Sequence, residues 1–390
     1  MLRFVTAGES HGQALIAWLS GLPAGVPVDF EFIRRELHRR QLGYGRGGRQ
    51  KIEKDSAEAI AGVRHGQTIG APIVLRVENK DWPNWEKALP VEDVAGAEDA
   101  RKPLTAPRPG HADLAGALKF NFHDARYILE RASARETAAR VAAGALAKIF
   151  LAQFGIEILS HVIGVGKVKL ERAVTWDEIR KVCADLESPL RCVDEATQDK
   201  MKAEVDKVLR AGDSVGGIFE VVAHNVPPGL GSHAQWDEKL DGRLARAIAS
   251  IQAVKAAEIG VGVAAASSYG SEVQDEISYD TKSRRFTRPT NRAGGLEGGI
   301  TNGEDVIVRG YLKPISTLRK PLGTADLVTK AAIQAAYERS DVCVVPAAGV
   351  AGEAMVALVL AEAFLEKFGG DSLGETQRNF EAYVKQLDQF

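Results

Sequence analysis

A glycine-rich loop with many arginines is the part of the chain best suited to bind a ligand. Eight Lys or Arg residues and only two acids lie within residues 34–54, and glycines recur through residues 43–51. Glycine lets the backbone come close to a ligand, and the planar guanidinium group matches a carboxylate or phosphate through two parallel hydrogen bonds. We therefore predict that Arg40, Arg46 and Arg49 bind an anion.

A serine and a histidine share a short turn near the N-terminus. Residues 8–12, Gly-Glu-Ser-His-Gly, have the spacing of the nucleophile turn of α/β-hydrolases. In that turn several strands precede the serine and a helix follows it, whereas here residues 14–19 have the pattern of a strand. An ester hydrolase is therefore the second hypothesis, and a structural loop with an exposed histidine is the alternative to any chemistry at this turn.

Two segments in the middle of the chain combine arginines with other polar groups. Residues 108–113, Arg-Pro-Gly-His-Ala-Asp, place an arginine three residues before an imidazole in a Pro-Gly bend. Residues 131–137, Arg-Ala-Ser-Ala-Arg-Glu-Thr, contain a capping box in which Ser133 and Glu136 begin an alanine-rich helix. A helix N-terminus has free amides and a positive dipole end, so this one is predicted to bind an anion as well as to be capped.

Other patterns are weaker alone. The glycines within 43–48 match a dinucleotide fingerprint, but a helix precedes them where that fingerprint needs a strand. Residues 294–303, 313–319 and 339–341 are polar or glycine-rich segments that are also typical of hairpin turns and a helix end. The sequence shows no Walker loop and no metal-spaced set of His and Cys, so no metal site is predicted.

Composition limits the class of protein. The chain has 390 residues, 45% of them hydrophobic, and a net charge of −2. This balance argues against a nucleic-acid binder, although Arg46-Gly47-Gly48-Arg49 leaves an RNA-binding module as a third hypothesis. Three cysteines without a C-x-x-C pair indicate a reducing compartment. With no leader-like segment and no run of 18 apolar residues, we expect a cytoplasmic protein without a membrane span.

The elements that position these residues follow from periodicity and caps. Helices are predicted over residues 30–39, 134–154, 176–182, 194–212, 236–260, 325–338 and 352–368. Strands are predicted over residues 14–19, 71–77, 156–165, 217–226, 261–265 and 305–312. Because the strands are grouped and do not alternate with helices, an α+β fold is favoured over a doubly wound sheet. We expect one domain over residues 1–390, with 167–212 a charged helical excursion from its core and a polar surface tail or subunit arm beyond residue 370.

Taken together and in chain order, these segments resemble the chorismate synthase family. The resemblance runs from residue 8 to beyond residue 349, so it covers essentially the whole chain. It implies a lyase that converts 5-enolpyruvylshikimate 3-phosphate to chorismate and phosphate, the last common step of the shikimate pathway of aromatic amino acid biosynthesis. The implied reaction is a 1,4-anti elimination that needs reduced FMN although it is redox-neutral overall.

The resemblance also implies an architecture and partners. The expected fold is a sandwich with a helical layer between antiparallel sheets, and the expected assembly is a homotetramer. No nucleic-acid partner is implied. Whether the chain reduces the flavin itself with NAD(P)H, or relies on an external flavin reductase, is left open.

The family's roles extend to matching residues of this chain. His111 is expected to protonate the reduced flavin near N1, His11 to assist departure of the phosphate, and Asp341 to help handle the proton lost from the substrate ring. Ser10 and Ser133 are expected to support by hydrogen bonding. The phosphate and two carboxylates of the substrate are expected at Arg40, Arg46, Arg49, Arg108, Arg135 and Arg339. The flavin is expected to contact Arg131, Ala132, Ser133, Gln252, Ala253, Gly298, Lys313, Pro314, Ile315, Ser316, Thr317 and Arg339. At Ala132 the family commonly has a serine, and Ser133 and the backbone are expected to serve in its place.

Overall fold

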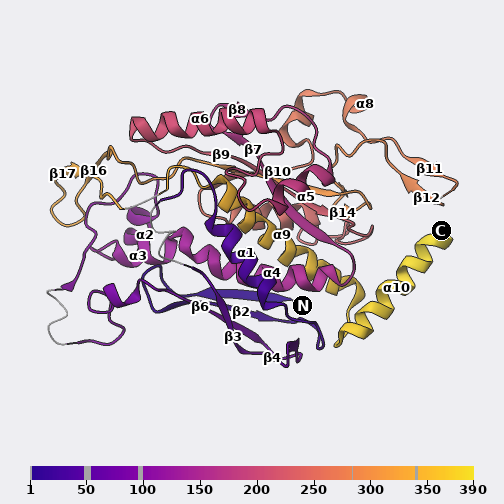
Figure 1. Ribbon diagram of the computed structural model, residues 1–390, viewed down its shortest axis with the longest axis horizontal. Coiled ribbons are helices and arrows are strands. Elements are labelled where there is room, and N and C mark those ends of the chain that lie inside the picture. The colour runs from indigo at the N-terminus through magenta and orange to yellow at the C-terminus, as the bar shows by residue number, and fades with distance from the viewer. Residues whose placement is uncertain (1, 48–53, 95–99, 283, 339–340) are drawn as a thin grey trace.

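Two antiparallel sheets enclose a layer of helices in the computed structural model (Figure 1), which describes residues 2–47, 54–94, 100–282, 284–338 and 341–390. The four-stranded sheet has the order β1 (Arg3–Ala7), β2 (Ala14–Ser20), β6 (Ile73–Glu78), β3 (Ala57–Ala61). The five-stranded sheet has the order β10 (Val254–Ile259), β15 (Val306–Leu312), β9 (Gly217–His224), β7 (Glu157–Val165), β8 (Val168–Lys169). The predicted α+β sandwich is confirmed.

Four helices fill the space between the sheets. They are α1 (Phe30–Gln41), α4 (Thr137–Ala152), α7 (Leu240–Ala249) and α9 (Val345–Phe368). Helix α4 packs on β2 and β6, whereas α9 packs on β7 and β9, and the two helices cross each other. Gly144 allows the crossing, because a Cβ added there would lie 2.3 Å from the Cβ of Ala354.

The remaining elements lie around this sandwich. Helices at its edges are α2 (Asp113–Phe120), α3 (Arg126–Ala132), α5 (Trp176–Ala184), α6 (Glu195–Ala211), α8 (Gly270–Val273) and α10 (Leu373–Gln389). Short 3-10 helices cover Trp82–Asn84, Ala134–Glu136 and Gly262–Ser267. The two-stranded hairpins are β4 (Val63–Arg64) with β5 (Gln67–Thr68), β11 (Ser278–Asp280) with β12 (Arg285–Thr287), β13 (Leu296–Glu297) with β14 (Ile300–Thr301), and β16 (Gly323–Ala325) with β17 (Ala332–Gln334).

Alternation along the strands builds the core. In β2 every second residue points toward α4, so Leu15, Ala17 and Leu19 are at most 1% exposed. Met201 and Val205 of α6 belong to the same hydrophobic cluster as residues of both sheets. The segment 167–212 therefore packs on the main core, and the assignment of one domain to the whole chain stays a prediction.

Helix α9 is long and apolar enough to span a membrane by length and composition. However, 89% of its most apolar stretch is buried inside the protein. Most residues of the helix are buried, including Glu353, as expected for a helix enclosed by other elements. We therefore assign α9 as a core helix.

Several predicted elements are wrong in type or extent. The helix predicted over 236–260 is shorter, because α7 ends at Ala249 and the chain reverses through Ala253, whose φ of 69° is left-handed, into β10. No strand forms over residues 261–265, because residues 262–265 belong to the 3-10 helix Gly262–Ser267.

The second wrong helix is the one predicted over 325–338. Strands β16 and β17 form a hairpin there, and Asp326 accepts hydrogen bonds from the amides of Val328 and Thr329 in its turn. Asp341 therefore does not follow a helix, and it lies shortly before α9, which begins seven residues earlier than predicted, at Val345. Strands β1 and β3 were not predicted, and the segment beyond residue 370 forms α10.

Candidate active site

The short 3-10 helix between α3 and α4 joins several predicted site residues. The Ser133 hydroxyl accepts a hydrogen bond from the Arg135 amide at 3.3 Å and caps this turn. The predicted capping box is wrong, because the Glu136 carboxylate instead accepts hydrogen bonds from Thr6 Oγ1 at 2.6 Å and Arg140 Nε at 2.8 Å. Ser133 thus caps the 3-10 helix, and α4 begins only at Thr137.

Two buried arginines share one carboxylate beside this turn. Arg40 Nη2 lies 2.5 Å from Asp55 Oδ2, and Arg135 Nη1 lies 2.6 Å from Asp55 Oδ1. Burial lowers the pKa of Arg40, and the charges of Arg135 and Arg46 lower it further. Arg40 Nε is buried and has no hydrogen-bond partner among the described residues. Three guanidinium groups therefore gather here, and a donor on one of them is left for a ligand.

Asn79 connects this arginine pair to the first histidine turn. Its Oδ1 accepts a hydrogen bond from Arg135 Nε at 3.0 Å, and its Nδ2 donates to the carbonyls of Glu9 at 3.0 Å and Gly12 at 2.7 Å. The turn links β1 to β2, so a strand follows Ser10. This is not the strand-to-helix geometry of a hydrolase nucleophile, and the hydrolase hypothesis loses its structural support.

His11 is held within the protein in this turn. His11 as a whole is 8% exposed, and its Nδ1 lies 2.9 Å from Glu130 Oε1. The imidazole stacks on Trp85 with 4.0 Å between ring centroids. The alternative of an exposed histidine in a structural loop is therefore wrong.

Arg46 pairs with the aspartate that precedes α9. Arg46 Nη1 lies 2.9 Å from Asp341 Oδ2, and the Gly47 amide donates to Asp341 Oδ1 at 2.5 Å. Arg46 Nε is buried with no hydrogen-bond partner among the described residues. Arg46 and Asp341, which were predicted separately as site residues, are thus brought together near Arg40, whereas Arg49 and Arg339 lie outside the described residues.

The second histidine turn is organised by Asp113. Arg108 Nε and the Arg108 amide donate to Asp113 Oδ2 at 2.8 and 3.0 Å, and His111 Nδ1 lies 2.5 Å from Asp113 Oδ1. Burial alone would raise the pKa of Asp113, but the hydrogen bonds from His111 and Arg108 outweigh it and hold this pKa well below its usual value. Arg108 Nη1 also donates to Thr317 Oγ1 at 3.1 Å, which joins the turn to the predicted cofactor segment.

The segment 313–317 lies against this histidine turn. A Cβ added at Gly110 would be 3.5 Å from Ser316 Oγ and 3.7 Å from Lys313 Nζ. Lys313 Nζ donates to Ser316 Oγ at 3.0 Å. Burial and the charge of Lys255 both lower the pKa of Lys313. The ammonium groups of Lys313 and Lys255 and the hydroxyl of Ser316 are therefore available to one anion. In the same loop, Pro314 follows Lys313, and the Ile315 carbonyl accepts a hydrogen bond from Ser214.

Gln252 and Ala253 connect the segment 313–317 to the 3-10 helix. The Lys313 amide donates to the Ala253 carbonyl at 3.0 Å, and Gln252 Nε2 donates to Glu136 Oε2 at 3.0 Å. Gln252 Oε1 is buried without a hydrogen-bond partner in the described part of the chain. This amide oxygen is therefore an acceptor that a ligand can use.

Other predicted cofactor residues have different surroundings. Arg131 donates to the carbonyls of Gly8 at 3.0 Å and Thr6 at 2.8 Å, so its guanidinium supports the end of β1, and Ala132 ends α3 beside it. Gly298 lies in the turn between β13 and β14, next to the first residue of α7, whereas Ala253 follows the last turn of that helix. Gly298 is thus not brought together with the other cofactor residues.

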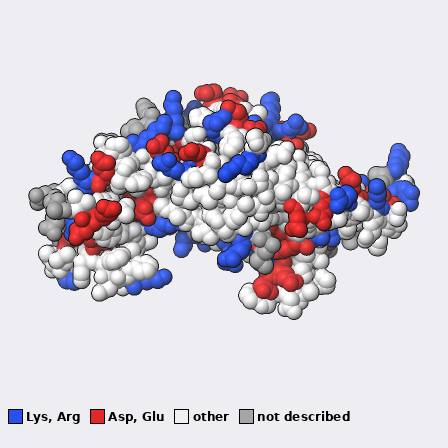
Figure 2. All heavy atoms as spheres, turned by 90° about the horizontal axis from the view of Figure 1, so that it is seen from below, with Lys and Arg blue, Asp and Glu red and all other residues white. Residues whose placement is uncertain are grey.

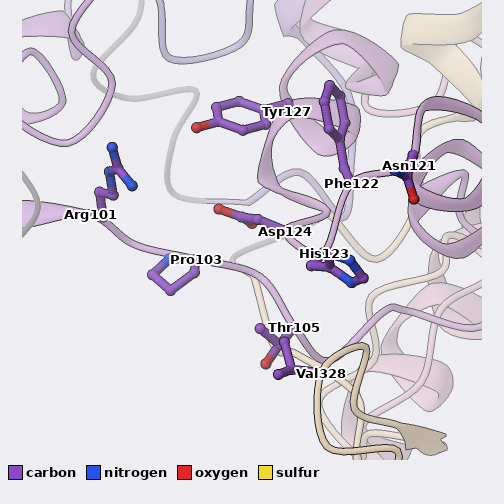
Figure 3. A pocket seen from close by; sticks show the side chains of 9 residues that line it. All are labelled: Arg101, Pro103, Thr105, Asn121, Phe122, His123, Asp124, Tyr127 and Val328. Carbon is purple, nitrogen blue, oxygen red and sulfur yellow. The ribbon is translucent and has the colours of Figure 1, made fainter. Parts of the chain in front are cut away.

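A separate open hollow of about 760 Å³ lies beside α2 and α3 (Figure 3). Arg101, Asn121, His123, Asp124 and Tyr127 are among the residues that line it. It contains none of the predicted site residues. We place the candidate active site at the arginine and histidine clusters and not at this hollow, because the predicted charged residues converge at those clusters.

Sequence reasoning missed the acidic partners of these clusters. Asp55 follows the arginine loop directly, and Asp113 stands in the second histidine motif, so proximity in sequence could have indicated both. Glu130 and Trp85 had no such signal, because they meet His11 only in the fold. No group of three His, Cys, Asp or Glu side chains suited to a metal occurs within the described residues.

Comparison with known proteins identifies the family. A sequence profile of chorismate synthase matches residues 2–365. The chain belongs to the chorismate synthase family. The chorismate synthase of Solibacter usitatus (strain Ellin6076) is 64% identical over 390 residues, and that of Koribacter versatilis (strain Ellin345) is 60% identical over 395, each covering 100% of both chains. A crystal structure of chorismate synthase aligns with a TM-score of 0.79 and 42% identity over 100% of this chain and 99% of that one.

Family membership establishes the general activity. The chain is an enzyme, a lyase of the shikimate pathway that leads to the aromatic amino acids. A chorismate synthase acts on 5-enolpyruvylshikimate 3-phosphate, and the family in general uses a flavin. The same sandwich in a solved chorismate synthase agrees with the fold described above.

Proposed function

We propose that this chain converts 5-enolpyruvylshikimate 3-phosphate to chorismate and phosphate by a 1,4-anti elimination that depends on reduced FMN. The observation that carries this proposal is the group of Arg40, Arg46 and Arg135, which Asn79 connects to the first histidine turn. The substrate has one phosphate and two carboxylates, and buried guanidinium groups with unused donors suit such anions. Arg49, Arg108 and Arg339 complete the proposed substrate set.

The residues near the second histidine turn fit a phosphate-bearing flavin. Lys313, Lys255 and Ser316 supply two cationic groups and a hydroxyl for the phosphate. The buried Oε1 of Gln252 supplies an acceptor for a ring N–H. We propose that reduced FMN binds there, contacting residues 313–317, Gln252 and Ala253, with Arg131, Ala132, Ser133 and Arg339 as the other contacts.

Proton handling in this proposal belongs to three side chains of the protein. Reduced FMN bound at this site would supply electron density for breaking the C–O bond to phosphate. His11 gives a proton to the departing phosphate, and Ser10 supports it by hydrogen bonding. His111, held at Nδ1 by Asp113, keeps a proton at the flavin. Asp341, held by Arg46 and the Gly47 amide, accepts the substrate proton.

The assembly and setting form part of the same proposal. We propose a cytoplasmic homotetramer that binds neither nucleic acid nor membrane and receives reduced flavin from its own NAD(P)H-dependent activity or from an external reductase. The outer face of the four-stranded sheet supports self-association, since Val5 and Ile60 are 54% and 52% exposed there. Figure 2 shows few charged side chains in the middle of that face. Light scattering should give four times the mass of one chain, and a monomer would contradict the proposal.

An anaerobic assay tests the reaction. Substrate and chemically reduced FMN should yield chorismate and phosphate in equal amounts, and one equivalent of flavin should support many turnovers. The absorption spectrum should be that of reduced flavin once the substrate is exhausted. Oxidation of one flavin for each product formed would contradict the redox-neutral elimination, and formation of no chorismate would contradict the proposed function altogether.

A further inference from the structure

Glu130, to which no role has been assigned above, makes several contacts to the turn that contains His11. Its Oε2 accepts a hydrogen bond from the His11 amide at 2.8 Å, and both carboxylate oxygens lie within 3.0 Å of His11 Nδ1. The Glu130 carbonyl also accepts a hydrogen bond from the Ser10 amide at 3.0 Å. Glu130 is 3% exposed, so water does not screen these contacts. One residue of α3 therefore fixes the backbone and the ring of His11.

An aromatic side chain limits the remaining rotation of the imidazole. Trp85 stacks on His11 with an interplanar angle of 28°. The indole is itself held, because its Nε1 donates to Asp81 Oδ2 at 3.1 Å and Lys102 Nζ lies 4.2 Å from the ring centroid. A hydrogen bond at Nδ1 and a stacked plane together define the direction of the ring, including the direction of Nε2.

Charged residues of both signs surround the pair of Glu130 and His11. Arg126 Nη1 lies 3.8 Å from Glu130 Oε1, and Arg126 Nη2 donates to Glu338 Oε1 at 3.0 Å. Among the described residues, Lys102 and Asp81 both contact the stacking partner Trp85, and Glu9 lies two positions before His11 in the chain. The Glu130 carboxylate lies between the imidazole and this guanidinium, so it is placed to accept a hydrogen bond from a protonated Nδ1.

We propose that Glu130 is a positioning residue for His11, which keeps the Nδ1 proton in place so that the proton given to the leaving phosphate comes from Nε2. This inference rests on the proposed function of His11. As the C–O bond breaks, the Nε2 proton passes to a phosphate oxygen and a neutral imidazole protonated at Nδ1 remains. The imidazole recovers its proton from water after the products leave. The arrangement orients the proton donor before substrate binds.

The test is a double-mutant cycle of Glu130→Gln and His11→Ala. The glutamine keeps the size of the side chain but removes the negative charge, and it replaces one of the two oxygens near Nδ1 by an NH₂ group, which donates and does not accept. For Glu130→Gln we expect kcat to fall about tenfold to a hundredfold with little change in KM. We also expect the pH dependence of kcat to differ from that of wild type. In the His11→Ala background, Glu130→Gln should cause no further loss, because Glu130 acts through His11. Glu338→Gln, which removes the other carboxylate on Arg126, is the matched control and should keep wild-type kcat.

Additive losses in the double variant, or an unchanged kcat in Glu130→Gln, would overturn the proposal. A second measurement depends neither on turnover nor on the folding of Glu130→Gln. In wild-type protein with ¹⁵N-labelled histidine, the neutral His11 ring, assigned by its loss in His11→Ala, should show a protonated Nδ1. A neutral ring protonated at Nε2 would overturn the proposal even if chorismate forms. If chorismate does not form but Nδ1 is protonated, the proposed function fails while the positioning by Glu130 stands.

Discussion

Arg46 is one of three clustered arginines, and for anion binding the planar shape of its guanidinium should matter more than its charge. It pairs with Asp341 through Nη1, while its buried Nε has no partner among the described residues. An ammonium group keeps the charge but loses the planar fork, so Arg46→Lys should raise the KM for substrate about tenfold or more, the equivalent of one charge-assisted hydrogen bond of about 1.5–3 kcal/mol. Steady-state kinetics measure this change. Arg34→Lys, on the exposed face of α1, is the control, and equal KM values for both variants would rule out a role of Arg46 in binding.

The two histidines should fail in different ways when they are removed. His111→Ala should still bind substrate but change the absorption spectrum of bound reduced flavin, because the proton held near N1 is lost. His11→Ala should leave that spectrum nearly normal without substrate and slow phosphate release in a single turnover. Loss of a general acid typically costs about 10²–10⁴-fold in rate, so rapid-quench measurements should resolve it. Identical spectral defects in both variants would contradict the division of roles, and FMN binding by each variant serves as the folding control.

Residue types were predictable at this scale, whereas their partners were not. Arginine in a glycine loop and histidine in a turn have chemistry that the sequence displays. The partner of each depends on contacts over long separations, such as Asp55 with Arg135 and Glu130 with His11. The sequence contains no signal for these two pairs, because the position of Asp55 after the arginine loop indicates only its contact with Arg40, and Glu130 could equally lie on a solvated face.

The crossing of α4 and α9 depends on the absence of one side chain. A Cβ at position 144 would lie 2.3 Å from Ala354 Cβ and 2.4 Å from its Cα, and the Cα belongs to the backbone and cannot move alone. Gly144→Ala should therefore destabilise the protein by about 1–3 kcal/mol, as overpacking of a core does. Thermal unfolding followed by circular dichroism measures the change.

Gly242 provides a control in another helix. An added Cβ there would meet nothing within 4 Å, and the residue lies within α7. Gly242→Ala should leave the melting temperature unchanged or raise it, since alanine is favoured over glycine in helices by up to about 1 kcal/mol. If both substitutions changed the melting temperature equally, close packing of α4 on α9 would not be the cause.

Element prediction succeeded where local signals agree with the tertiary structure. Asp29 and the capping box of Thr175 with Glu178 begin α1 and α5 as predicted. It failed at 325–338, because a helical apolar pattern there accompanies an Asp326 turn that closes a hairpin. It also missed β1 and β3, since these outer strands of the four-stranded sheet are only five residues long and alternate between more and less exposed residues.

At the scale of the whole molecule, a net charge of −2 conceals separate clusters of charge. One is the cationic group at Arg40, and another lies in the helical layer. There Arg39 and Lys148 both contact Glu353, at 2.8 and 2.5 Å, and Glu36 contacts the same two cations. Glu353 also accepts a hydrogen bond from the Ser160 amide of β7, so the network joins α1, α4 and α9 to the five-stranded sheet.

This network predicts how stability depends on pH. Burial alone would raise the pKa values of Glu353 and Glu36, but the charges of Arg39 and Lys148 outweigh it and lower both pKa values. A carboxyl whose pKa is lower in the folded state contributes stability above its unfolded pKa of about 4.3, and this contribution is lost as pH falls toward the folded pKa. The free energy of unfolding, measured by urea denaturation, should thus be nearly constant from about pH 7 to pH 5 and fall steeply below about pH 4.

Glu353→Gln should lower the free energy of unfolding by about 3–5 kcal/mol at pH 7, because it leaves buried cations without their partner. The difference in this free energy between the variant and wild type should narrow in acid, as the wild-type carboxylate is protonated. Glu381→Gln, at an exposed position of α10, should follow the wild-type curve throughout. A gap between Glu353→Gln and wild type that stays constant from pH 7 to pH 3 would show that the ionised form of Glu353 does not stabilise the fold.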